Sequence, residues 1–294
     1  MINMELLSNL LNLSLPNLLT NENLFLIVLA IVWIIGAIIQ DLRKREVDNL
    51  WNFSLIAFAL AYRFSISVFT NNYLFFINGL LGLLVFLILG NLFYYSRLFA
   101  GGDAKLLIAL GSILPLSYYW LLNLKIFGLF ILLFLFGGSI YVFIWSLCLV
   151  IISRDKFGKE FIKQFKIYKN IFLIGIIFFI IGIVASFIRL EFILISIFLL
   201  FPILFIYSKA VEESCMVKAI NPRELTEGDW LYEDVYIKGK KIEKSWHGVS
   251  KEELGLIRKK YRRKILVKYG VPFTPSFLIG FLGLLYLSLR FNLS

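Results

Sequence analysis

The sequence is poor in the side chains that most soluble enzymes use for chemistry. It has one histidine, His247, and two cysteines, Cys148 and Cys215, which lie far apart. An HExxH zinc site needs two histidines on one helix, and a serine protease would have to recruit this single remote histidine. Two distant cysteines indicate neither a disulfide framework nor a metal cluster. We therefore expect no metal and no other cofactor, and we interpret His247 as an ordinary surface or packing residue.

Charged residues are scarce as well. Only 17% of the 294 residues are charged and 60% are hydrophobic, whereas soluble domains average about 25% charged and about half apolar. Apolar runs approach the roughly 20 residues that cross a bilayer. We predict an all-α membrane protein of about eight transmembrane helices, the fourth and seventh being weakest because they contain Pro115 and Pro202. The runs are residues 24–40, 52–69, 73–95, 104–122, 126–152, 170–188, 192–207 and 271–291.

The positive charges are concentrated in alternate loops. The formal net charge is +11, but nearly all Lys and Arg residues fall in one set of loops, so the excess indicates membrane topology rather than a nucleic-acid partner. Basic loops face the cytoplasm. We therefore expect a multi-pass protein of the cell membrane with both termini outside. Residues 1–23 lack Lys and Arg and are predicted to be an external segment.

Residues 208–270 interrupt the apolar pattern with dense charge, turn dipeptides and an alternating stretch, Trp230 to Ile237. We predict a small cytoplasmic α+β domain between a seven-helix core, residues 24–207, and a final helix in residues 271–294. Within the domain, residues 250–268 are expected to form a basic helix that begins with a capping box. This helix is expected to rest on the anionic headgroups of the lipid bilayer; a role in gripping substrate is the alternative.

Acidic residues are rare in the first half of the membrane region. Between residues 24 and 154 the only ones are Asp41, Glu46, Asp48 and Asp103, and all four map to the predicted cytoplasmic face. Asp41 ends the first helix and Asp103 opens the fourth, so both carboxylates could share one water-filled pocket. Ionisable groups near membrane depth are costly and are functional candidates by default. The alternatives are that Asp103 caps its helix, with Lys105 as an anchor, and that Asp41 pairs with Arg45.

Two short motifs resemble those of the aspartic type IV prepilin peptidases, and within that family the archaeal preflagellin and prepilin peptidases. The first is Asp41 to Arg45, a D-x-[KR]-x-[KR]-like segment, and the second is Gly102 to Lys105, within a Gly-x-Gly-Asp-like loop that also holds Gly101. Two positions depart from the pattern: Ala100 replaces the first glycine, and Asp48 stands where bacterial relatives usually carry proline. The C-terminal run YGVPFTPSFLIGF also looks like that of some archaeal members.

The resemblance implies an aspartic endopeptidase with Asp41 and Asp103 as its catalytic pair, supported by Gly101, Gly102 and Lys105. Its substrates would be prepilin or preflagellin (archaellin) precursors with class III signal peptides, whose basic leader is removed at the cytoplasmic face. Because a helix N-terminus favours an anion, we expect Asp103 to be the base and Asp41 to carry the proton; the alternative is that the positive charges of Arg43 to Arg45 reverse the two roles. The remaining acids, Glu46 and Asp48, could hold basic residues of the substrate.

Two other functions stay open. A presenilin-like intramembrane protease also uses a Gly-x-Gly-Asp motif, but its first aspartate lies inside a helix, whereas Asp41 directly precedes a basic segment. A transporter or channel could use Asp41, Asp103 and Arg63 as a polar path. Transporters commonly show internal repeats and discontinuous helices at mid-membrane. This sequence has no evident repeat, and we expect a structural role for Arg63.

Overall fold

A computed structural model describes residues 18–237, 240–245 and 248–292. The chain divides into two compact units, which we describe separately. Unit 1 comprises residues 1–143 and 272–294, and unit 2 comprises residues 144–271. The division falls within one long helix, α6 (Trp120–Ile152). His247 and most of the expected external segment lie outside the described residues.

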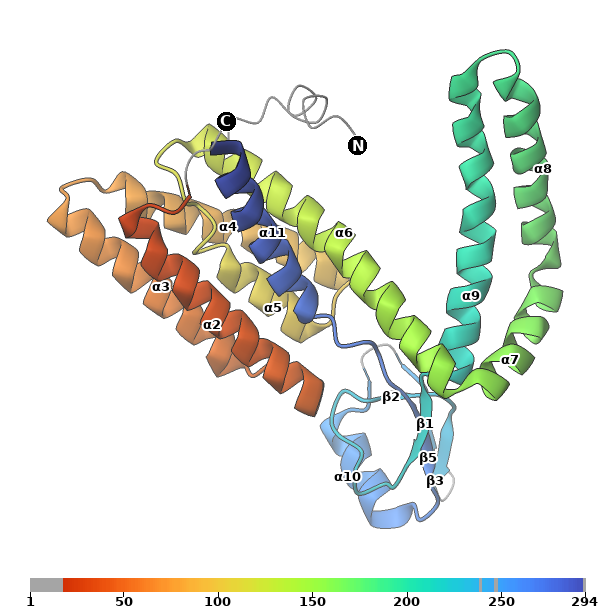
Figure 1. Cartoon of the computed structure of the whole chain (residues 1–294). Helices are drawn as coiled ribbons and strands as arrows, with labels where there is room; N and C mark the ends of the chain where they lie inside the picture. Colours follow the sequence, from red (N-terminus) through yellow and green to blue (C-terminus); the bar gives the residue numbers. More distant parts are fainter. Residues whose placement is uncertain (1–17, 238–239, 246–247, 293–294) are drawn as a thin grey trace. The chain divides into compact units, whose positions relative to one another are not determined.

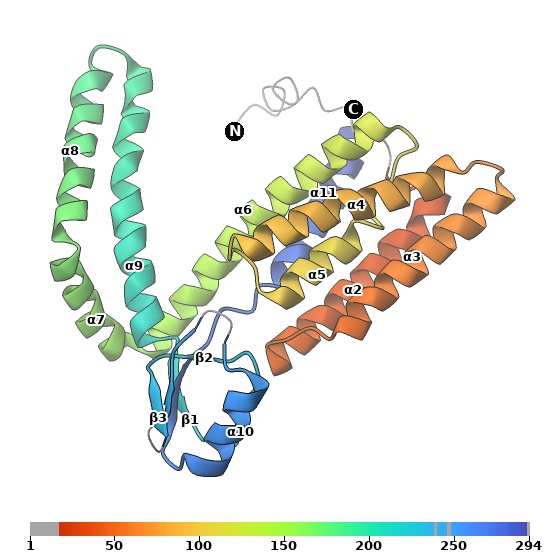
Figure 2. The same ribbon diagram turned by 180° about the vertical axis from the view of Figure 1, so that it is seen from behind.

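Unit 1 is a helical bundle whose short helix α5 packs against α2, α3 and α4 (Figures 1 and 2). Its core is built from aliphatic and phenylalanine side chains, including Phe134, which packs on Phe277 with 4.4 Å between ring centroids. Many large apolar side chains are exposed on the outside, as expected of a surface that faces lipid. Besides the start of α6, the helices are α2 (Asn21–Lys44), α3 (Asn49–Phe69), α4 (Leu74–Tyr95), α5 (Gly101–Leu110) and α11 (Pro275–Asn292).

The described residues contain six helices that are long and apolar enough to cross a membrane, and α11 is a shorter apolar helix. The multi-pass architecture is therefore confirmed, while the count of eight spanning helices is not. The fourth predicted helix, residues 104–122, differs most from the structure. It is replaced by α5, of 10 residues, and by an irregular segment that continues to the start of α6.

Residues 101–118 nevertheless run alongside α4 for most of its length. Glycines on α4 allow this close approach: a Cβ added at Gly90 would lie 3.0 Å from the carbonyl oxygen of Ala104, and one at Gly82 would lie 2.4 Å from that of Gly111. Farther along, the Asn78 side chain donates hydrogen bonds to the carbonyls of Ser117 and Tyr118. A short helix plus an irregular segment thus replaces one continuous helix.

Irregular backbone inside a membrane protein is stable only where protein groups satisfy its carbonyls. Arg63, which is fully buried on α3, does most of this. Its guanidinium donates to the carbonyls of Ser112, Ile113 and Pro115 just beyond α5, and to that of Phe75 on α4, at 2.8–2.9 Å. Arg63 therefore has the structural role expected from the sequence, which removes the main observation in favour of a polar transport path.

Unit 2 continues α6 into α7 (Arg154–Ile167), followed by a helical hairpin and a small domain with strands (Figure 1). The hairpin pairs α8 (Lys169–Ser186) with η1 (Leu190–Leu199) and α9 (Leu200–Ser214), and η1 is a 3-10 helix. The seventh predicted helix, residues 192–207, thus begins in 3-10 geometry and ends later than expected, at Ser214. Together η1 and α9 form one of the six candidate spans.

The region with strands lies between α9 and α11. Strand β5 (Ile265–Lys268) pairs antiparallel with β1 (Val217–Ile220) and β2 (Trp230–Leu231), while β3 (Val235–Ile237) pairs with β4 (Lys240–Ile242). The capping box of Ser250 and Glu253 is confirmed. The basic helix is shorter than predicted, since α10 ends at Lys260.

The chain after α10 becomes β5 because its alternating Ile265 and Val267 fill the core of this region. The predicted α+β character is therefore confirmed for residues 217–268.

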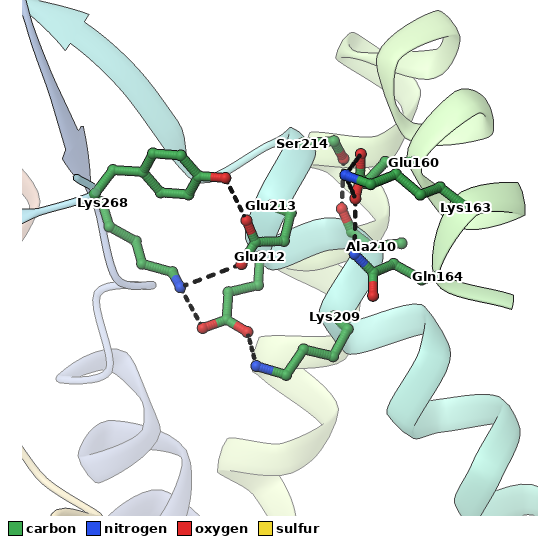
Figure 3. A network of polar contacts seen from close by, with 10 residues as sticks. Glu160, Lys163, Gln164, Lys209, Ala210, Glu212, Glu213, Ser214 and Lys268 are labelled. Atoms are coloured by element: carbon green, nitrogen blue, oxygen red, sulfur yellow. Dashed lines mark hydrogen bonds and ion pairs between the residues drawn. The ribbon is translucent and has the colours of Figure 1, made fainter. Parts of the chain in front are cut away.

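A polar network ties the end of α9 to the strands of unit 2 (Figure 3). Lys268 of β5 pairs with Glu212 and with Glu213, and Glu212 also pairs with Lys209 at 2.8 Å. The Tyr232 hydroxyl donates to Glu213 at 2.6 Å. This hydrogen bond, followed by burial, raises the pKa of the Tyr232 phenol to about 12. These contacts hold β5 against the helix that precedes the first strand.

Candidate active site

Asp41 lies in the last turn of α2 and is buried, with 8% of its surface exposed. Its Oδ2 accepts a hydrogen bond from the Thr274 hydroxyl at 2.9 Å and a longer one from the Thr274 backbone N–H at 3.4 Å. Thr274 directly precedes α11, so the last helix of the chain reaches the end of the first described helix. The α2 helix stops three residues later, where Arg45 adopts a left-handed conformation, with φ of 60°.

Asp103 lies in the first turn of α5, outside the six candidate spans. The residue is half-buried. Burial, and then the negative charge of Asp41, raise the pKa of the Asp103 carboxyl to about 7, although the backbone N–H of Ala100 acts in the opposite direction. The charge of Asp41 acts on Asp103 only because the two carboxyl groups are close. The two predicted aspartates are therefore within electrostatic range of each other.

Opposing effects act on the protonation of Asp103. A helix N-terminus favours the ionised form of Asp103, but the effect is typically 0.3–1 kcal/mol. Burial and a neighbouring negative charge both favour the protonated form, and they outweigh it here. Both effects therefore act on Asp103 in the direction opposite to the helix dipole.

Further contacts join the two motifs. The Lys105 ammonium donates to the side-chain oxygen of Asn49 at 2.6 Å, and Asn49 follows the first motif at the start of α3. Gly102 packs beside Val47, whose backbone nitrogen would lie 3.4 Å from an added Cβ. The backbone N–H of Asp48 donates to the side-chain oxygen of Gln40 at 2.9 Å. The loop between α2 and α3 is thereby held against the first turn of α5.

The glycines of the second motif are not strongly required by the fold. A Cβ at Gly101 would make only an ordinary contact, 3.7 Å from the Tyr94 ring, and the one at Gly102 is similarly spaced at 3.4 Å. Neither glycine has a positive φ. A methyl group at either position would therefore be accommodated by the packing.

The other two predicted acids are exposed. Glu46 and Asp48 both lie in the loop between α2 and α3, and Asp48 forms a long ion pair of 3.9 Å with Lys44. Both side chains of that pair are more than half exposed, so the interaction is weak. Because both side chains are exposed, their carboxylates are accessible to a basic partner from outside the chain.

Three residues near the motifs were missed by the sequence analysis. Thr274 contacts Asp41 directly, and Tyr141 of α6 lies close enough to feel the charge of Asp41. Asn52 is buried one helical turn beyond Asn49, and neither polar atom of its amide has a hydrogen-bond partner within the described part of the chain. The TP dipeptide before an apolar run indicates a helix start, but no local pattern indicates that its hydroxyl meets Asp41.

Comparisons with known proteins agree with these motifs. The sequence model of the type IV leader peptidase family matches residues 27–153, which include both aspartates. A preflagellin peptidase of Methanococcus maripaludis is 35% identical over 154 residues, covering 46% of this chain and 66% of the relative. A preflagellin peptidase of Methanocaldococcus jannaschii is 33% identical over 89 residues, covering 28% of this chain and 38% of the relative.

No solved structure matches the chain. The chain spans 66% of the length of the first relative and 38% of the second, so the likeness concerns part of each protein. The matched region holds most of α2, all of α3 to α6, and the two motifs with Asp41 and Asp103. On this evidence residues 27–153 of the chain resemble the type IV leader peptidase family.

Proposed function

We propose that this chain is a membrane-embedded aspartic endopeptidase that removes the basic leader peptide of preflagellin or prepilin-like precursors. The proposal rests on one observation above all: Asp41 and Asp103, one from each family-like motif, come within electrostatic reach at the ends of α2 and α5. Two neighbouring carboxyl groups that share a proton can activate water without a metal or a histidine. The names of the two relatives supply the class of substrate.

We assign different tasks to the two carboxyl groups. Both hydrogen bonds from Thr274 go to Oδ2 of Asp41, so Oδ1 can take a proton from water. That water attacks the scissile carbonyl carbon, while protonated Asp103 donates to the carbonyl oxygen. The carbon–nitrogen bond then breaks as the leaving amine receives the proton held by Asp41, and Asp103 regains its own. The products are a carboxylic acid and an amine, and both carboxyl groups return to their starting states.

Substrate features follow from the surroundings of the pair. We infer that the site faces the cytoplasm, because the flanking loop carries Arg43, Lys44 and Arg45 and basic loops stay on that side. An extended peptide backbone would pass over Gly101 and Gly102, where no side chain blocks its approach to Asp103. The exposed Glu46 and Asp48 would attract the basic residues that precede the apolar helix of a class III signal peptide.

The test is cleavage of precursors by the full chain in detergent. Wild type, Asp41→Asn and Asp103→Asn are each mixed with a preflagellin and with prepilin-like precursors, and the shortened product is followed by mass spectrometry. Either substitution should lower the rate by a factor on the order of 100 to 10,000. Asp155→Asn, which changes an exposed acid in the first turn of α7, is the matched control and should cleave normally. Full activity in either Asp→Asn variant would exclude the carboxyl pair, and no cleavage by wild type would favour a transport function.

A further inference from the structure

The site has a contributor from outside the region that resembles the family. Thr274 is fully buried and lies 233 positions along the chain from Asp41, whose carboxylate it contacts through both its hydroxyl and its backbone N–H. The family match ends at residue 153. Nothing in that match therefore accounts for a hydroxyl group from the start of α11 beside the first aspartate.

Close packing between α6 and α11 fixes the position of Thr274. On α6, a Cβ added at Gly138 would lie 2.9 Å from the Phe273 ring and 3.0 Å from the Ser276 hydroxyl. On α11, a Cβ added at Gly280 would lie 2.8 Å from the backbone of Phe134. The start of α11 thus lies against α6 with no room for a larger residue at these glycines.

The ring of Phe273 adds a second restraint immediately before Thr274. Its centroid lies 5.6 Å from that of Phe99 and 5.4 Å from that of Phe134. Phe99 belongs to the segment that leads into α5, two residues before that helix begins. The aromatic cluster therefore connects the position of Thr274 to the segment that carries Asp103, as well as to α6.

We propose that Thr274 is a positioning residue: it holds the Asp41 carboxylate in the rotamer that directs Oδ1 toward water and Asp103. This inference rests on the proposed function of Asp41. Two donors on one residue, a hydroxyl and a backbone N–H, converge on Oδ2, and no hydrogen bond to Oδ1 is found among the described residues. The last helix of the chain is then part of the active site and not only a membrane anchor.

The hydroxyl is tested by Thr274→Val, which keeps the shape and removes the donor, and by Thr274→Ser, which restores it. The valine variant should lower kcat by up to about 100-fold, as expected when a reacting group is misplaced by about 1 Å, while KM changes little. The serine variant should recover most of the rate. The pH profile of the valine variant should shift relative to wild type, because the carboxyl pair titrates as a unit.

Ser276→Ala is the matched control. Ser276 is also buried at the start of α11, but its hydroxyl has no hydrogen-bond partner among the described residues. Its loss should leave kcat, KM and the melting temperature close to wild type. A purely structural role for Thr274 would lower the melting temperature and the amount of folded enzyme, with kcat per folded enzyme and the pH profile unchanged, and would overturn the proposal.

A readout that does not depend on cleavage separates this proposal from the proposed function. Carbodiimide labelling of Asp41, measured by mass spectrometry, should increase in Thr274→Val and stay unchanged in Thr274→Ser and Ser276→Ala. Equal labelling of Asp41 in wild type and Thr274→Val would overturn the positioning role. If labelling increases but wild type cleaves no precursor, the contact stands and the peptidase function fails.

Discussion

Arg63 in unit 1 and Lys268 in unit 2 both make several polar contacts, but in different surroundings. Arg63 is fully buried and donates only to backbone carbonyls, beyond the C-terminal end of α5 and on α4. Lys268 is 24% exposed and pairs with the carboxylates of Glu212 and Glu213 (Figure 3). Water cannot reach the irregular segment inside unit 1, so Arg63 supplies the hydrogen bonds that its carbonyls need. The carboxylates that pair with Lys268 can also form hydrogen bonds with water.

The buried hydrogen bonds of Arg63 explain how unit 1 can contain the short helix α5 and the irregular segment that follows it. An unsatisfied buried carbonyl costs about 1–3 kcal/mol, so residues 111–118 need internal donors. Because Arg63 supplies those donors, the chain can form the short helix α5, which begins at Gly101. The first turn of this helix places Asp103 within electrostatic range of Asp41. In unit 2 Lys268, Glu212 and Glu213 are partly exposed to water and connect β5 to α9. Each of these contacts is therefore expected to contribute little to stability.

The largest expected effect is that of Arg63→Met. Removing the guanidinium leaves four carbonyls without their donor, and we expect a loss of about 3–5 kcal/mol in the free energy of unfolding of unit 1. Thermal unfolding in detergent, followed by circular dichroism, measures the loss, and cleavage should disappear with the folded state. A melting temperature equal to that of wild type would show that the buried hydrogen bonds of Arg63 are not needed for the stability of the fold.

The next effect is the pH dependence of cleavage. Since the pKa of Asp103 is raised to about 7, its proton is present below pH 7 and is lost above it. The rate should therefore fall about tenfold per pH unit above that value if protonated Asp103 is the acid. A rate that instead rises as pH increases through 7 would show that the ionised form of Asp103 is the active one, and that Asp103 acts as the base.

The raised pKa of Asp103 also makes the free energy of unfolding depend on pH. The folded protein holds the Asp103 proton at pH values where the unfolded chain, with its ordinary pKa of 3.8, has released it. The free energy of unfolding should therefore decrease as pH rises from about 4 to about 7. Asp103→Asn should remove this part of the slope. The melting temperature measured against pH in both proteins tests the shift without any substrate.

A smaller effect is expected for Lys268→Met. The side chain is partly exposed and its acidic partners can return to water, so the loss should be about 1 kcal/mol or less. Cleavage should be unaffected, because Asp41 and Asp103 belong to unit 1. A loss as large as that of Arg63→Met would show that the network in Figure 3 is as critical as the buried arginine.

The smallest effects are expected at the exposed acids of unit 1. Glu46→Gln and Asp48→Asn each remove one exposed charge, which is worth about 0.2–1 kcal/mol in a surface ion pair. KM for a precursor with a basic leader should rise up to about fivefold, and the change should shrink at high salt. An unchanged KM in both variants would limit these acids to a solvated surface role.

Several elements were predictable because their determinants are local. The apolar runs gave α2, α3 and α4 within a few residues, and the capping box gave the start of α10. The fourth helix was predicted incorrectly because an apolar stretch looks the same whether it is one helix or a short helix plus a buried loop. What decides between them is Arg63, which lies about 50 residues earlier in the chain.

The sequence by itself determined that the chain crosses a membrane, where its acids are, and which two of them the motifs single out. Those features follow from composition, spacing and charge, which act over a few residues. Only the tertiary structure decided that Asp41 and Asp103 are within electrostatic range of each other, that Asp103 is buried, and that the Thr274 hydroxyl donates to Asp41. These outcomes depend on how distant helices pack, because burial and hydrogen-bond partners exist only once the chain has folded.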